Sequence, residues 1–317
     1  MMYNINAENQ YGWREIRKEC QRRAKRWVVK VGTSSLVQVD GALDQKKIAT
    51  LLQQILAMKQ GGLEVVMVLS GAVGVGASRL ERPVGKLSER QRRVAASVGQ
   101  SCIIQALLQA LSQFSQLGDG KELELSQILL SRDDFSHRKR YRNAKMLLRD
   151  LLREDTIPVV NENDVIGSRL HNLGNNDRVA ALIASMIDAQ LLVLLTDQIG
   201  LYTGNPHQDA QAQLITEGIA EDPQLLKMAT GSGKFGTGGM LTKLLAARMA
   251  AQCGTDTIIA SSAERNILLR IAEGEPVGTF LYQKKRLVKT RLDERLDHLA
   301  QRMFGYPNAA QIAIGAV

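Results

Sequence analysis

The chain has 317 residues, of which 44% are hydrophobic and 23% are charged, and this composition is typical of a globular protein. Its longest apolar runs, residues 65–69 and 191–195, are far shorter than the roughly 18 residues that cross a bilayer, so we expect a cytoplasmic protein without a membrane partner. Three widely spaced cysteines indicate neither a zinc site nor a disulfide framework. The net charge of +9 fits either a nucleic-acid surface or attraction for anionic small ligands.

Much of the excess positive charge lies in the first 26 residues, where the lysine and arginine residues between 14 and 26 surround few apolar positions. Charge runs of this kind are commonly solvated. We therefore interpret residues 1–26 as a basic extension, a solvated leader that can form a helix, in preference to a specific binding arm.

From Trp27 onward, short β-rich apolar runs alternate with longer segments of helical periodicity. The first strand is expected at 28–31, and a helix capped by Asp44 leads to a second strand at 65–69. Further strands are expected at 128–130, 157–160, 191–195 and 257–259, and further helices at 144–152 and 241–253. This alternation predicts an α/β protein with a mostly parallel sheet. In such sheets ligands bind beyond the carboxyl ends of the strands.

Small and polar residues follow the expected strands. Lys30 ends the first strand and leads into a turn at Gly32, whose backbone N–H groups can face phosphate oxygens. The second strand leads into Ser70, Gly71 and Ala72, where a ligand can approach the backbone closely. Each turn alone is weak support for a ligand site, because glycine is often present in a turn only for its backbone flexibility.

Four later segments are more informative. Residues 161–164 read Asn-Glu-Asn-Asp at the end of a buried run, and residues 175–177 read Asn-Asn-Asp before an alanine-rich helix, which one of them is expected to cap. Thr196 and Asp197 end another strand, and a glycine-rich loop at 236–243 ends in a lysine at a helix start, which suits phosphate binding. The glycines at 231, 233 and 236 match GxGxxG, but no strand leads into them, so they do not predict a dinucleotide site.

Taken in order, seven segments resemble the glutamate 5-kinases of the amino acid kinase family over residues 27–281. They read VVKVGTSSL, VLSGAVGVG, AASVGQS, NENDV, NNDRVAALIA, LLTDQIGLYTGNP and GTGGMLTK. The resemblance implies a three-layer α/β/α sandwich, an amino acid kinase domain at 27–281, and a tail at 282–317 that is only the opening of a PUA-like domain. It implies ATP-dependent phosphorylation of the γ-carboxylate of L-glutamate to L-glutamyl 5-phosphate, the first step of proline biosynthesis, with Mg²⁺ and without a metal site built by the protein.

The resemblance also assigns roles to residues. The expected catalytic residues are Lys30, Lys243 and Asp177, with the aspartate organising the two lysines. The expected substrate contacts are Ser70, Gly71, Ala72, Asp164, Asn175 and Asn176. The expected ATP contacts are Lys30, Gly32, Thr196, Asp197, Thr237, Gly238, Gly239, Met240, Leu241, Thr242 and Lys243.

Asn175 stands where the family usually has aspartate, so we expect weakened glutamate binding. The family also suggests a homo-oligomer and hand-over of the product to glutamate-5-semialdehyde dehydrogenase. Two alternatives stay open: another family member with a different carboxylate, carbamate or phosphate substrate, and a catalytically weak regulator or RNA-binding protein. Nucleic acid is the less favoured partner, because both lysines and Asp177 remain in place.

Overall fold

A central eight-stranded sheet organises the molecule, for which the computed structural model describes residues 15, 17–38, 40–114, 123–166, 175–206, 208–230 and 239–283. From edge to edge its strands are β3 (Leu125–Leu130), β4 (Ile157–Glu162), β2 (Glu64–Leu69), β1 (Arg26–Val31), β5 (Leu191–Thr196), β9 (Asp256–Ser261), β10 (Thr279–Tyr282) and β8 (Glu217–Ile219). All neighbouring strands run parallel except β9 and β10. A separate hairpin joins β6 (Leu201–Tyr202) to β7 (Leu214–Ile215).

Each strand expected from the sequence lies inside an observed strand. Every residue of β5 is buried, as are five of the six in β1 and in β2. Strands covered on both faces read as continuous apolar runs, which is why the sequence located them. The short strands β10 and β8, at one end of the sheet, carry little such pattern and were not predicted.

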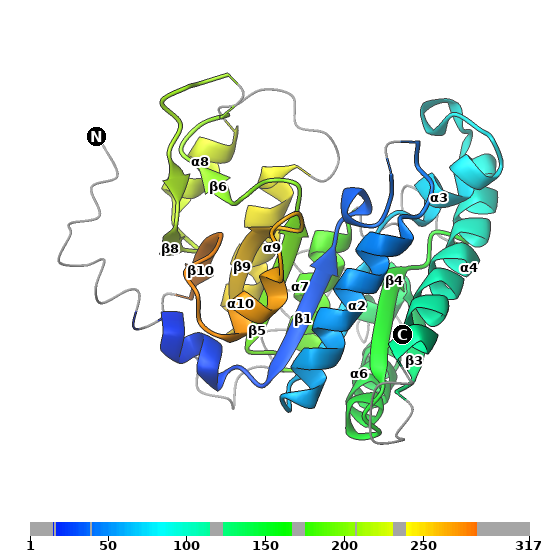
Figure 1. Ribbon diagram of the computed structural model, residues 1–317, viewed down its shortest axis with the longest axis horizontal. Helices are drawn as coiled ribbons and strands as arrows, with labels where there is room; N and C mark the ends of the chain where they lie inside the picture. Colours follow the sequence, from blue (N-terminus) through cyan, green and yellow to red (C-terminus); the bar gives the residue numbers. More distant parts are fainter. Residues whose placement is uncertain are drawn as a thin grey trace, which may run out of the picture.

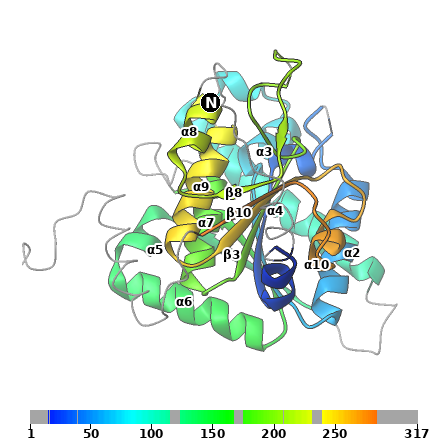
Figure 2. The same cartoon turned by 90° about the vertical axis from the view of Figure 1, so that its left-hand side faces the viewer.

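Helices cover both faces of the sheet (Figure 1), so the predicted three-layer α/β/α sandwich is confirmed. One face carries α2 (Gln45–Gln60), α4 (Glu89–Phe114) and α10 (Ile267–Ala272), and the other carries α6 (Arg138–Arg153), α7 (Asn176–Met186) and α9 (Met240–Gln252). Figure 2 shows the two helical layers on opposite sides of the strands. Shorter elements connect them: α3 (Ala72–Arg79), α5 (Arg132–Ser136), α8 (Pro223–Thr230) and the 3₁₀ turns η1 (Thr33–Ser35) and η2 (Val84–Lys86).

Within the described ranges, α4 is the one helix with the length and apolarity of a membrane span, and half of its apolar window is buried in the protein. Its buried residues recur at helical spacing, as at Ala95, Gly99, Ile103 and Ala106. This stripe packs against α2 and α3. We therefore interpret α4 as a core helix of the sandwich.

Two glycines allow α3 and α4 to cross in backbone contact. A Cβ on Gly76 would lie 1.7 Å from the Ala95 carbonyl oxygen, and one on Gly99 would lie 1.8 Å from that of Ala72. Side chains never approach so closely, so glycine is required at both positions. The crossing fixes the start of α3, where Gly71 adopts φ 105° in the left-handed region that favours glycine.

The N-terminal helix, residues 17–23, packs against β10 and the segment just before it. Arg17 and Gln21 are 1% and 2% exposed, and the Arg17 guanidinium donates to the Val277 carbonyl and lies 5.6 Å from the centre of the Phe280 ring. Burial lowers the pKa of Arg17 to about 10, against the opposing charge of Glu217. The prediction of a solvated leader is therefore wrong for this face of the helix.

The domain boundaries at 27 and 282 stay predictions. Residues 1–14 and the tail from 284 onward lie outside the described residues, and so does the expected PUA-like opening.

Candidate active site

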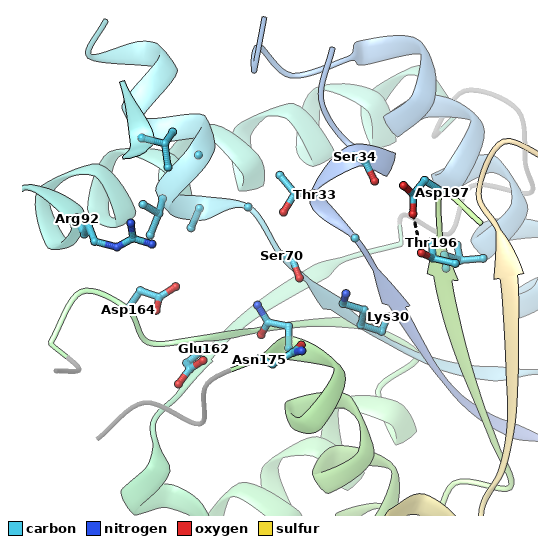
Figure 3. A pocket seen from close by; sticks show the side chains of 18 of the residues that line it. Lys30, Thr33, Ser34, Ser70, Arg92, Glu162, Asp164, Asn175, Thr196 and Asp197 are labelled. Atoms are coloured by element: carbon cyan, nitrogen blue, oxygen red, sulfur yellow. Dashed lines mark hydrogen bonds between the residues drawn. The ribbon is translucent and has the colours of Figure 1, made fainter. Parts of the chain in front are cut away.

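A cavity of about 950 Å³ opens at the carboxyl ends of β1, β2, β4 and β5 (Figure 3). This is the edge where ligands bind in parallel sheets, and the volume is at the upper end of ordinary ligand sites. Many of the predicted site residues line it: Lys30, Gly32, Ser70, Gly71, Ala72, Asp164, Asn175, Asn176, Thr196, Asp197 and Lys243.

Three charged groups meet at the floor of the cavity. Lys30 lies on the central strand β1, between Val68 of β2 and Leu194 of β5. Side chains alternate along a strand, so Lys30 projects to the same face as Val28, which packs in the core cluster with α7 and α9. The first turns of α7 and α9 carry Asp177 and Lys243 on this same face.

Asp177 lies between the two lysines. Its Oδ1 is 2.7 Å from Nζ of Lys30, and its Oδ2 is 3.3 Å from Nζ of Lys243. The hydroxyl of Thr242 also donates to Oδ2, at 2.9 Å. Asp177 is fully buried, and the lysines are 5% and 4% exposed. This geometry matches the organising role that the resemblance implies for Asp177, while its part in catalysis stays a prediction.

The cluster holds its charges in a dry environment. Burial by itself raises the pKa of Asp177, but the two lysines outweigh it and the net pKa falls below the ordinary value. Burial lowers the pKa of Lys243, and the neighbouring charge of Lys30 lowers it further, while Asp177 opposes both. Two cations share one carboxylate, so the cluster carries an excess positive charge that attracts an anion such as a phosphoryl group.

The two asparagines before Asp177 set the start of α7. Asn175 caps the helix, and its Oδ1 accepts from the Asp177 N–H at 2.7 Å, which confirms the predicted cap. Its Nδ2 is buried and has no hydrogen-bond partner in the described part of the chain, and the same holds for Oδ1 of Asn176. Each amide therefore keeps one polar atom that a ligand can satisfy.

One end of the cavity is formed by the residues that follow β4. Asn161 serves the protein itself, because its amide donates to Gln100 and its oxygen accepts from the Glu162 N–H. Asp164 and Arg92 of α4 lie near each other at this end of the cavity, as Figure 3 shows. Burial raises the pKa of Asp164, and the charge of Arg92 opposes this rise.

Sequence reasoning missed Arg92. It belongs to the charge run of Arg90, Arg92 and Arg93, where nothing in the pattern distinguishes a cavity side chain from a solvated one. Its place just before the AASVGQS segment was the available signal.

The opposite end of the cavity is formed by Thr196 and Asp197 at the end of β5. The Thr196 hydroxyl donates to Oδ1 of Asp197 at 2.9 Å. Of the predicted ATP loop, Thr237 and Gly238 lie outside the described residues, and Gly239 precedes α9. Met240 and Leu241 pack against the apolar core, so their side chains do not line the cavity.

The described residues contain no group of three or more histidine, cysteine, aspartate or glutamate side chains placed to hold a metal ion. Buried cations beside glycine turns, at the carboxyl edge of a parallel sheet, define an enzyme that transfers phosphoryl groups. The sequence model of the amino acid kinase family matches residues 25–261, and the chain belongs to this family.

The chain is also similar to individual named proteins over most of its length. The chain is 43% identical over 270 residues to "Glutamate 5-kinase" of Thioalkalivibrio sulfidiphilus (strain HL-EbGR7), covering 85% of this chain and 70% of that protein. It is 42% identical over 281 residues to "Glutamate 5-kinase" of Ectopseudomonas mendocina (strain ymp), covering 88% and 73%.

Solved structures share the fold at low sequence identity. A carbamate kinase from Giardia lamblia bound to AMP-PNP superposes with a TM-score of 0.60 at 19% identity, over 83% of this chain and all of that one. UMP kinase from Bacillus anthracis gives 0.58 at 16% identity, over 84% of this chain and 99% of that one.

Proposed function

We propose that this protein transfers the γ-phosphoryl group of ATP to the γ-carboxylate of L-glutamate. The product is L-glutamyl 5-phosphate, and the reaction is the first step of proline biosynthesis. The relatives named glutamate 5-kinase, which cover 85–88% of the chain, support the substrate. The single structural observation that carries the chemistry is the buried cluster of Lys30, Asp177 and Lys243 between the two ends of the cavity.

The reaction needs cations and alignment more than it needs a base. A glutamate side chain has a reference pKa of about 4.3, so its carboxylate is already ionised and nucleophilic at neutral pH. A carboxylate oxygen attacks the γ-phosphorus, a new P–O bond forms, and the bond to the leaving ADP breaks. Charge on the transferring group is stabilised by Lys30 and Lys243. Asp177 acts as a positioning residue that holds both ammonium groups.

ATP and Mg²⁺ are the cofactors. When bound together with ATP, Mg²⁺ would neutralise negative charge on the phosphates. For the nucleotide we propose the Thr196 end of the cavity, with the turn at Gly32 and the N-terminus of α9 facing the phosphates. The free N–H groups at the start of α3 then face the γ-carboxylate, because a helix N-terminus favours an anion.

The remaining assignments are proposals that rest on the family. Ser70, Gly71, Ala72, Asp164, Asn175 and Asn176 contact glutamate, the protein acts in the cytoplasm as a homo-oligomer, and glutamate-5-semialdehyde dehydrogenase receives the labile product.

The test is ATP turnover with Mg²⁺ and L-glutamate, compared with D-glutamate, aspartate and N-acetylglutamate, with hydroxylamine to trap an acyl phosphate. We expect hydroxamate that depends on L-glutamate and that Lys243→Ala abolishes. Lys46→Ala is the matched control, because Lys46 is exposed on α2 and lies outside the cavity. Phosphorylation of another acid in preference to L-glutamate would assign a different substrate, and turnover of no acid would contradict the proposal.

A further inference from the structure

The cavity has two ends, and the lysine cluster lies between them. In Figure 3 Thr196 and Asp197 lie on one side of Lys30, while Arg92 and Asp164 lie on the other. With the nucleotide at the Thr196 end, the acceptor extends from Lys30 toward Arg92 and Asp164. The groups at that end therefore meet the part of the acceptor that does not react.

The charge of Arg92 is not neutralised by an ion pair among the described residues. Its neighbour Arg93 binds Glu89 at 2.7 Å, whereas the Arg92 guanidinium forms no ion pair within 4.0 Å among the described residues. Its electrostatic neighbour is Asp164, which lies near it at the same end of the cavity. A planar guanidinium donates two parallel hydrogen bonds to a carboxylate, so Arg92 offers a fork to an anionic ligand.

An α-amino acid carries an ammonium and a carboxylate on one carbon atom. This end of the cavity carries the complementary charges of Arg92 and Asp164, beside the further charged side chains of Glu89, Arg93 and Glu162. We propose that Arg92 binds the α-carboxylate of the substrate while Asp164 binds its ammonium group. This proposal rests on the proposed function and adds a specificity-determining residue to it. Such a pair favours a free α-amino acid over acids that lack either group, because each missing group removes a charge-assisted hydrogen bond between substrate and protein.

The backbone fixes where Arg92 lies relative to the reacting centre. Arg92 lies on α4, and α4 crosses α3 at Gly76 and Gly99 without intervening side chains. The start of α3 carries Gly71, at the expected position of the γ-carboxylate. The residues proposed to hold the two carboxylates thus belong to two helices in direct backbone contact.

The test compares substrates that differ only at the α-carbon. 4-Aminobutyrate is glutamate without its α-carboxylate, and L-isoglutamine carries a neutral amide in its place. For Arg92→Gln we expect the KM for L-glutamate to rise on the order of tenfold to a hundredfold with kcat nearly unchanged. The kcat/KM for 4-aminobutyrate and for L-isoglutamine should be the same in both proteins, and Arg92→Lys should restore part of the glutamate affinity.

The matched control is Arg90→Gln, which removes the same charge from an exposed residue of α4 outside the cavity and should leave all three substrates unaffected. Where 4-aminobutyrate turns over too slowly, its inhibition constant against L-glutamate gives the same comparison. An equal loss for L-glutamate and 4-aminobutyrate would overturn the assignment, since Arg92 would then act on folding or on phosphoryl transfer. Failure of the wild-type protein to phosphorylate L-glutamate would instead refute the proposed function.

Discussion

Replacing Asp177 with asparagine removes the one carboxylate that the structure places between Lys30 and Lys243. The change preserves the shape of the side chain. It leaves two ammonium groups that are 5% and 4% exposed, with no anion between them. Loss of one partner from a buried ion pair costs about 3–5 kcal/mol of unfolding free energy, which is a large share of the roughly 5–15 kcal/mol that stabilises a typical domain.

Denaturant unfolding monitored by circular dichroism measures this loss. We expect the Asp177→Asn protein to unfold at clearly lower denaturant concentration, and its kcat to fall by at least about a hundredfold, as the lysines lose their positions. Mg²⁺-ATP should stabilise the variant more than the wild type, because its phosphates replace the missing negative charge.

Asp150→Asn provides the control, since Asp150 pairs with Arg153 at 2.9 Å on the exposed face of α6 and should contribute little. If Asp177→Asn unfolded like the wild type and kept its kcat within a fewfold range, the lysines would not depend on this carboxylate and the reasoning would fail.

Three further changes test other parts of the site. The lowered pKa of Lys243 predicts that kcat falls as pH rises through a value below the ordinary lysine pKa of 10.5, because Lys243 then loses its charge. Lys243→Arg should move this fall in kcat to higher pH. A fall at the same pH in the variant would mean that another group causes it. Asn175→Asp should lower the KM for L-glutamate about fivefold to thirtyfold. Oδ1 of Asn175 already caps α7, so the change replaces the donor Nδ2 with a charged acceptor oxygen. An unchanged KM would contradict this prediction. Gly99→Ala should lower the melting temperature by several degrees and raise the KM for glutamate. The reason is that the Cβ of the new alanine would lie 1.8 Å from the Ala72 carbonyl oxygen. A melting curve like that of the wild type would contradict the close crossing of α3 and α4.

The sequence predicts most of the sheet and much of the cavity for the same physical reason. Strands buried on both faces are continuous apolar runs, and the chemistry of a parallel sheet collects where those runs end. Lys30, Asp177 and Lys243 each lie at a strand end or a helix start, so the segments that contain them could be found without coordinates.

Arg92 and Arg17 escape this reasoning because tertiary contacts decide their surroundings. Arg92 reaches the cavity only because α4 crosses α3 at two glycines, and a charge run does not reveal which of its members faces inward. Arg17 is buried by Val277 and Phe280, which lie at the other end of the described chain. No local pattern records either contact.

The strand order also determines when the sheet can form while the chain is being synthesised on the ribosome. The central strand β1 pairs with β2 on one side and with β5 on the other, and β5 is made long after β2, β3 and β4. Until β5 emerges, the nascent sheet exposes an apolar edge of the kind that recruits foreign strands. Lys30 likewise waits for Asp177, which lies on α7, the helix directly before β5. A chain released before β5 is made is therefore expected to aggregate or to be degraded, and not to act as a weak enzyme.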